Sequence, residues 1–199
     1  MRKAAKSLSI IILFALGCIW IYSCGSGSDL LDEQNSNYTG FISFSDGGQE
    51  DTLTIDVLRD LDCDNDGNAT DPEPFTDVLA RINISVDENA PGITLRDYQI
   101  EFIPISTPDP FGTPIMPPDL TDLTAHGSFT FSVPSGGDGS FTITCMNFNT
   151  KDQFVLNWPA TLENARYTIR VTLNFEDEYL EERQIILERT VLLDDYDRC

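Results

Sequence analysis

Hydrophobic and polar side chains alternate with a period of two over most of the chain after Tyr38. Successive side chains of a β-strand point to opposite faces, so this alternation predicts half-buried strands. Tyr167–Phe175 is the clearest case, with an apolar residue at every second position. β-Branched and aromatic residues, which strands favour, fill the alternating segments. The predicted strands are Tyr38–Phe44, Leu53–Leu58, Val78–Val86, Ile93–Ile105, Ser128–Val133, Gly139–Met146, Tyr167–Phe175 and Ile185–Leu193.

Turn-forming residues separate the predicted strands. Clusters of Gly, Pro, Asn and Asp occupy positions 46–48, 89–92, 135–139 and 157–159, and such clusters mark turns. Residues 104–118 hold six prolines. This stretch is expected to be a Pro-rich loop or an edge crossing, because proline cannot donate a hydrogen bond to a sheet.

The number and spacing of the strands predict the fold class. About eight short strands, with turns at roughly ten-residue spacing, are typical of an all-β, antiparallel two-sheet sandwich. A closed barrel is the alternative. Asn149–Leu156 is compatible with one helical turn, and no other part of this region has a helical period. The last two strands, Tyr167–Phe175 and Ile185–Leu193, are expected to pair as an antiparallel hairpin with Val171 facing the core.

The N-terminal residues follow a different pattern. Arg2, Lys3 and Lys6 form a short cationic stretch, and an apolar run extends from Leu8 to Tyr22. This run has the length of a signal-peptide core and is short for a transmembrane helix, which needs roughly 20 apolar residues. We therefore expect a cleaved signal peptide, and an uncleaved membrane anchor is the alternative.

The end of the apolar run carries a candidate lipid-attachment site at Cys24. Ile21 supplies the aliphatic residue at −3 and Ser23 the small residue at −1. Cleavage before Cys18 instead would leave an apolar segment at the start of the mature chain. We predict a covalent diacylglycerol or acyl lipid at Cys24, with more than one chain, because a single chain binds membranes only marginally. The predicted division is residues 1–23 as signal peptide, 24–37 as lipidated cysteine and flexible tether, and 38–199 as the β-sandwich domain.

The charge of the chain limits its partners. All 33 acidic residues follow Cys24, whereas three of the 12 basic residues lie in the first six positions. Removal of the signal peptide therefore takes the net charge from −21 to −24. A chain this acidic repels nucleic acid and anionic membrane surfaces. Cations, basic proteins and neutral polymers such as glycans stay open as partners, and the acidity can also serve solubility alone.

A run of acidic residues at 62–73 is the sharpest local motif. Asp62, Asp64 and Asp66 occupy alternating positions. Gly67 allows a sharp turn, and Glu73 stands in the bidentate position of a D-x-D-x-[DN]-G-x5-E calcium loop. No amphipathic helices flank the motif, so both a Ca²⁺ site and a solvated Asx-rich turn stay open. The ligands of a calcium site would be Asp62, Asp64, Asp66, Asn68, Thr70 and Glu73.

Few residues of the chain are suited to catalysis. His126 is the only histidine, which argues against zinc sites and against Ser/His/Asp or Cys/His nucleophiles. A carboxylate pair of the glycosidase type stays open, since 33 acidic residues offer many combinations. Trp158, Phe111 and Tyr179 could stack on sugars, and ordinary aromatic packing is the plainer interpretation.

Two segments resemble a group of uncharacterised Ig-like β-sandwich surface lipoproteins of anaerobic, metal-respiring bacteria. One runs from Asp62 to Asp77, and the other is the C-terminal segment from Leu193 to Cys199. The resemblance covers about residues 50–199. It implies an Ig-like sandwich on the cell surface. It carries over no known activity, and calcium binding at the acidic loop is not carried over from the group. It also implies a disulfide between Cys63 and Cys199, with Cys145 as an addition specific to this chain.

The sequence as a whole predicts a cell-envelope lipoprotein that acts as a non-enzymatic binding or structural module. The lipid would hold it to a membrane, and its partner would be an envelope protein or a glycan rather than nucleic acid. We expect it in the outer membrane, at the cell surface or the periplasmic face. The alternatives are an accessory subunit of an outer-membrane electron-transfer or pilus assembly and a carboxylate-dependent glycan hydrolase.

Overall fold

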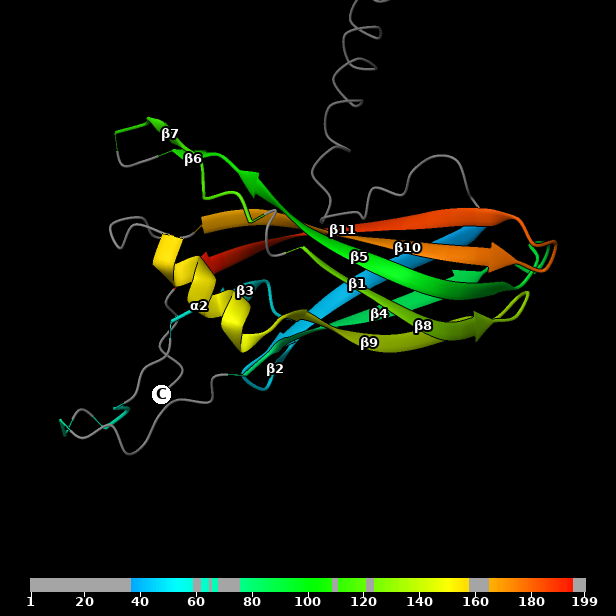
Figure 1. Cartoon of the computed structure of the whole chain (residues 1–199), viewed down its shortest axis with the longest axis horizontal. Helices are drawn as coiled ribbons and strands as arrows, with labels where there is room; N and C mark the ends of the chain where they lie inside the picture. The colour runs from blue at the N-terminus through cyan, green and yellow to red at the C-terminus, as the bar shows by residue number, and fades with distance from the viewer. Residues whose placement is uncertain are drawn as a thin grey trace, which may run out of the picture.

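The computed structural model describes residues 37–58, 62–64, 66–67, 76–108, 111–120, 124–157 and 165–194. In these residues two β-sheets pack face to face around one hydrophobic core (Figure 1). The prediction of an all-β two-sheet sandwich is therefore confirmed. The two sheets are separate, so the alternative of a closed barrel is wrong.

We name the two layers sheet A, with the order β2-β1-β4-β9, and sheet B, with the order β3-β11-β10-β5-β8. Sheet A contains β1 (Tyr38–Asp46), β2 (Gln49–Glu50), β4 (Val78–Val86) and β9 (Asp138–Met146). Sheet B contains β3 (Thr54–Asp56), β5 (Ile93–Ile105), β8 (Ala125–Val133), β10 (Ala165–Asp177) and β11 (Glu182–Asp194).

Among the described residues, the strand pairings are antiparallel with one exception. The short strand β3 pairs parallel with the end of β11 at the edge of sheet B. It retains only three residues of the run Leu53–Leu58 that the sequence predicted, and Leu53 and Leu58 are exposed. A parallel edge strand of this length adds few hydrogen bonds, so its main effect is to cover the end of the exposed edge of β11.

The hairpin of β10 and β11 forms the centre of sheet B. Val171 lies opposite Leu187, and Val171 is fully buried. The predicted pairing of the last two strands and the predicted inward orientation of Val171 are therefore confirmed. The buried side chains of β10 are Ala165, Tyr167, Ile169, Val171, Leu173, Phe175 and Asp177.

Strand β5 does not keep one face toward the core along its whole length. Leu95 and Ile100 are both buried, although they lie five positions apart, an odd offset that strict alternation would place on opposite faces. The register with both neighbouring strands skips Arg96, which marks a β-bulge. A bulge inserts one extra residue and re-aims the side chains that follow it. This explains why Leu95 and Ile100 can both belong to the core.

The sandwich has two different ends. At the turn end lie the start of β1 and the connections β4–β5, β8–β9 and β10–β11. Backbone hydrogen bonds join them: Asp87 N–H donates to Asn37 O (2.9 Å), and Glu178 N–H donates to Gly92 O (3.1 Å). At the opposite, helix end lie α2 (Phe148–Asn157) and a small hairpin of β6 (Thr107–Pro108) and β7 (Pro114–Ile115), which projects away from the sheets (Figure 1). The Pro-rich segment is thus partly an ordered hairpin.

Helix α2 extends the single helical turn that the sequence predicted to ten residues. The Asn147 side chain caps its start by accepting a hydrogen bond from Thr150 N–H (2.9 Å). Phe154 and Lys151 lie one turn apart on the buried face, and the Phe154 ring packs against Tyr167 with centroids 6.0 Å apart. In the part of the chain described, no helix has the length and hydrophobicity to cross a membrane.

Candidate functional site

The outer face of sheet A exposes two large apolar side chains where a sandwich normally shows polar residues. Phe41 is 52% exposed and Leu79 is 39% exposed. Each stands beside a second apolar residue in sequence, Ile42 and Val78, and that neighbour takes the core position. Only one member of such a pair can face inward, so the other is left on the solvent side.

Strand register gathers these side chains into one patch, which we call the sheet A face. Phe41 lies opposite Asn83, and Ser45 lies opposite Leu79, in the β1–β4 pairing. Arg81 lies between them, opposite Ser43 on one side and Thr142 of β9 on the other. The nine residues of the sheet A face are Phe41, Ser43, Ser45, Leu79, Arg81, Asn83, Ser140, Thr142 and Thr144.

Arg81 is held at the centre of this face. Its Nε–H donates to Ser140 Oγ at 3.1 Å, which orients the guanidinium along β9. At the rim, Arg189 Nη1 donates to Ile42 O (2.8 Å) and to Asp51 Oδ1 (2.7 Å). These contacts border an open groove of about 860 Å³ over the sheet. Within it, hydroxyl, amide and guanidinium groups alternate with apolar surface, a mixture found in binding sites.

The acidic motif lies at the helix end. Asp62, Asp64 and Asp66 come together with carboxylate oxygens within 4.8 Å of one another. Asp62 accepts hydrogen bonds from Asp66 N–H (3.1 Å) and Gly67 N–H (2.8 Å), and Asp64 Oδ1 accepts from Asp66 N–H (3.1 Å). Gly67 has a φ of 86°, a conformation that glycine adopts readily. The loop is therefore a turn in which aspartate carboxylates accept hydrogen bonds from backbone N–H groups. Carboxylate oxygens are also the ligands that Ca²⁺ uses.

The remaining residues of the predicted calcium set, Asn68, Thr70 and Glu73, lie outside the described residues, as do Cys24 and Cys199. Cys63 is disulfide-bonded, and its partner is not among the described residues. Cys145 is buried and free, so it is not the partner of Cys63. The pairing of Cys63 with Cys199 stays a prediction.

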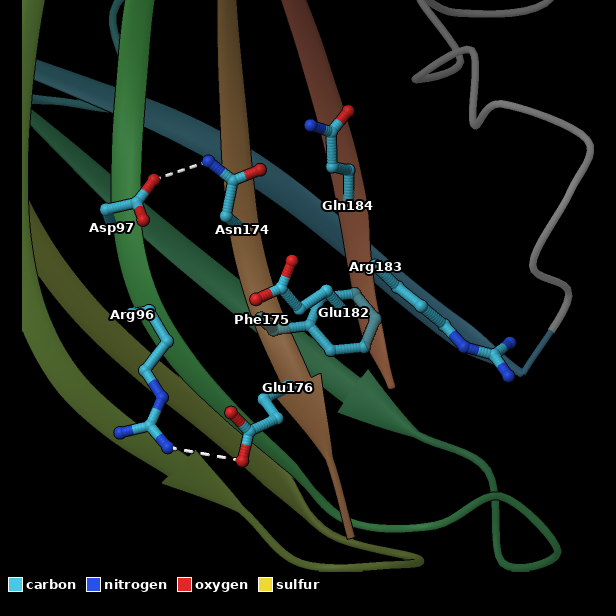
Figure 2. Close-up of a pocket in the computed structure, with 8 residues that line it drawn as sticks. All are labelled: Arg96, Asp97, Asn174, Phe175, Glu176, Glu182, Arg183 and Gln184. Atoms are coloured by element: carbon cyan, nitrogen blue, oxygen red, sulfur yellow. Dashed lines mark hydrogen bonds and ion pairs between the residues drawn. The ribbon is translucent and has the colours of Figure 1, made fainter. Parts of the chain in front are cut away.

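A second, polar groove of about 510 Å³ lies over sheet B beside the bulge at Arg96 (Figure 2). Internal contacts fill it: the Asn174 amide donates to the Asp97 carboxylate, and Arg96 pairs with Glu176 at 3.3 Å. Two of its three carboxylates are thus engaged with neighbouring side chains. This groove offers less unengaged polar surface than the sheet A face.

The other residues of interest are scattered over the surface. His126 is exposed at the start of β8, opposite Gln99. Phe111 is 92% exposed between β6 and β7 at the helix end, and Tyr179 is 75% exposed at the turn end. These two aromatic side chains therefore do not form one sugar-stacking platform. Trp158 lies outside the described residues.

One buried contact was missed by sequence reasoning. Lys151 Nζ lies 2.7 Å from Asp46 Oδ1, with 0% and 1% of the two side chains exposed. The positions are 105 residues apart, and Asp46 had been assigned only to a turn. The sequence did contain one indication that Lys151 is special, because Lys151 is the only lysine after Lys6.

Comparison with known proteins gives no family. No protein-family model matches the chain, and no curated protein matches it. Solved structures give weak similarity only. A target of the Northeast Structural Genomics Consortium is 9% identical over 78% of this chain and 86% of its own (TM-score 0.42). A protein from Archaeoglobus fulgidus is 10% identical over 58% and 83% (TM-score 0.38). Spo0M, a sporulation control protein from Bacillus subtilis, is 8% identical over 79% and 50% (TM-score 0.31).

Proposed function

We propose that this chain is a lipid-anchored module of the bacterial cell envelope that binds a neutral glycan on the sheet A face without catalysing a reaction on it. The observation that carries the proposal is the exposure of Phe41 and Leu79 around Arg81 on one side of the sandwich. Sheet faces of monomeric domains are normally polar toward solvent, and exposed apolar surface rimmed by polar groups marks binding sites.

The chemistry of this face suits a sugar chain. A pyranose ring presents an apolar face of C–H groups, which stacks on an aromatic ring such as Phe41. Its hydroxyls need donors and acceptors at the edges of that contact, and Arg81 and Asn83 supply both kinds. A row of Ser and Thr hydroxyls on β1 and β9 lengthens the patch along the strands, as binding of an extended polymer requires.

Charge selects among the possible polymers. The net charge of −24 after removal of the signal peptide repels polyanions such as nucleic acid. The nine residues of the sheet A face include one arginine and no acidic residue. At the β2 edge of the groove, Glu50 and Asp51 add two carboxylates, and Asp51 is paired with Arg189. A neutral glycan meets no charge repulsion there, whereas a polyanionic polymer would be repelled by the acidic surface of the rest of the domain.

The attachment point leaves the sheet A face accessible. The chain enters the sandwich at Tyr38, at the turn end, so an anchor at Cys24 would join the domain there and not on either sheet face. The 13 peptide bonds that link Cys24 to Asn37 could span at most about 45 Å. This reach separates the domain from the bilayer and leaves both outer sheet faces open to envelope polymers. Ca²⁺ at Asp62, Asp64 and Asp66 would act in this proposal as a structural ion.

The test is binding of the detergent-solubilised full chain to a panel of neutral polysaccharides, measured by co-sedimentation and on a glycan microarray. Phe41→Ser and Arg81→Gln should each weaken binding at least about tenfold, equivalent to about 1.4 kcal/mol. Arg96→Gln, an exposed arginine on the opposite sheet, is the matched control and should bind like wild type. No retention on any neutral glycan, or equal losses in Arg96→Gln, would contradict the proposal.

A further inference from the structure

The contact between Lys151 and Asp46 is unusual for the kind of cation it uses. After Lys6 the chain contains eight arginines and one lysine. Every arginine among the described residues is at least partly exposed, and Lys151 is the only cation of that part of the chain that is buried. Arginine is the usual choice for buried ion pairs because its rigid guanidinium matches a carboxylate. Lysine differs in being able to lose a proton and act as a nucleophile.

The two reacting groups are held against each other by separate elements. Lys151 belongs to the first turns of α2, where its N–H donates to Asn147 O (3.0 Å). Asp46 ends β1, and its Oδ1 lies 2.7 Å from Lys151 Nζ. A reaction between two groups fixed in this way is intramolecular. Well-oriented intramolecular pairs have effective molarities far above any concentration reached in solution.

The second oxygen of Asp46 also has a defined partner. Asp46 Oδ2 accepts a hydrogen bond from the backbone N–H of Asp56 at 2.8 Å. When a nucleophile adds to a carboxyl carbon, negative charge develops on the oxygen that stays. A fixed N–H aimed at that oxygen stabilises the charge without reorganisation, as in an oxyanion hole. The Asp56 N–H thus occupies the place of such a donor.

Burial favours the product of this reaction over the ion pair. Two buried charges carry a desolvation cost that their mutual attraction only partly offsets. An amide is neutral, and its formation removes both charges. The near-complete exclusion of solvent from the two side chains also disfavours the reverse reaction, which needs a water molecule at the carbonyl carbon.

We propose that Lys151 and Asp46 are an intramolecular modification site, at which they condense to an amide cross-link. A proton moves from Nζ to Asp46 Oδ1, and the amine then attacks Cγ. The Nζ–Cγ bond forms, the Cγ–Oδ1 bond breaks, and Oδ1 leaves as water with two of the three protons that the ammonium carried. Nothing is oxidised or reduced, and no co-reactant is needed.

The cross-link would join the end of β1 to α2 across 105 residues. Unlike the disulfide at Cys63, an amide resists thiol reductants. It would hold the helix end of the sandwich closed under extracellular conditions that reduce or reshuffle disulfides. The inference stands independently of the glycan proposal, because it concerns two buried side chains and not the solvent-exposed side chains of the sheet A face.

Peptide mapping of the purified full chain tests the cross-link. The chain is denatured, reduced and alkylated, so that no disulfide survives, and then digested and analysed by tandem mass spectrometry. We expect a branched peptide containing Asp46 and Lys151, lighter by one water than its two linear components together. Linear peptides alone, with Lys151 available to an amine-reactive label after denaturation, would overturn the proposal.

Lys151→Arg is the matched variant, because it keeps a positive charge but cannot form the amide. It should give only linear peptides, and under reducing conditions the denatured variant should migrate more slowly on an SDS gel than the cross-linked wild type. A branched peptide of unchanged abundance in Lys151→Arg would overturn the assignment of the amine. If this variant does not fold, the peptide map of the wild-type chain decides alone.

Discussion

Single residues of the core couple stability to pH. Burial raises the pKa of the Cys145 thiol above its ordinary value of 9.0. Burial likewise raises the pKa of Tyr167 above 10.0, and its phenol O–H donates a hydrogen bond to Pro118 O at 2.8 Å. Both groups are neutral in the folded protein, and charging either one in place would leave an unpaired buried anion.

Stability should therefore fall at alkaline pH. A group whose pKa is raised on folding contributes its full stabilising effect below the unfolded pKa and loses it as the pH rises toward the folded pKa. We expect the free energy of unfolding to be level from pH 7 to about 8.5 and then to fall, at up to about 1.4 kcal/mol per pH unit from Cys145. Urea melts of wild type and Cys145→Ala at pH 7.5, 9 and 10 measure this. An equal slope in the variant would show that the thiol does not contribute.

The aspartate loop gives a second prediction at this scale. Asp62, Asp64 and Asp66 crowd three carboxylates within 4.8 Å, and a cation bound to the folded state alone would raise stability by mass action. Millimolar Ca²⁺ should raise the melting temperature by a few degrees, and a chelator should reverse the change. Asp64→Asn keeps an acceptor for the Asp66 N–H and should lose the response. Identical melting curves with calcium and with chelator would leave the loop as an acidic turn.

At the scale of elements, one inserted residue decides which side chains of β5 reach the core. Ile93 and Leu95 precede the bulge at Arg96, and Ile100 and Phe102 follow it, yet all four are buried. Without the bulge, strict alternation would point one of these pairs at solvent, because a shift of one residue exchanges the two faces of a strand.

Deletion of Arg96 should therefore cost far more than removal of its side chain. The deletion would turn either Ile93 and Leu95 or Ile100 and Phe102 outward, and burial of each such side chain is worth about 1.5–3 kcal/mol. We expect the deletion variant to be unfolded or destabilised by several kcal/mol. Arg96→Gln keeps the bulge and should change stability by less than about 1 kcal/mol. Chemical denaturation of both variants is the measurement, and a stable deletion variant would show that the bulge can move.

At the scale of the whole molecule, the two ends of the sandwich have different roles in the proposed function. The start of β1 lies at the turn end, and α2, the β6–β7 hairpin and the aspartate loop lie at or beyond the ends of the strands on the other side (Figure 1). An anchor that precedes Tyr38 would thus place the turn end toward the membrane and the helix end away from it.

Lipid attachment is the prediction on which that orientation depends. In cells fed a labelled fatty acid, Cys24→Ser should lose the label and either leave the membrane fraction or accumulate as an unprocessed precursor. Cys18→Ser is the matched control and should keep both the label and the membrane location. Label that is lost in Cys18→Ser and kept in Cys24→Ser would move the cleavage site to Cys18.

The sequence by itself determined the strands, because their signal is local. Alternation of side chains is a property of extended backbone, so Val78–Val86 and Ile93–Ile105 could be delimited to the residue without knowing their partners. The β10–β11 hairpin was predictable for a related reason, since a short acidic turn joins two strands of matched alternation. The aspartate loop was also visible, because its three carboxylates lie close together along the chain.

Tertiary structure alone decided the features on which the two proposals depend. The pairs Phe41-Ile42 and Val78-Leu79 are locally ambiguous, and the β1–β4 register placed both spare side chains on one face with Arg81 between them. Asp46 and Lys151 lie 105 residues apart, so no local pattern links them. Register and long-range contacts are set by the collective burial of whole sheets, to which each residue contributes little alone. The composition shows that Lys151 is the only lysine after Lys6. Only the packing of α2 against the end of β1 brings its ammonium within 2.7 Å of the buried Asp46 carboxylate.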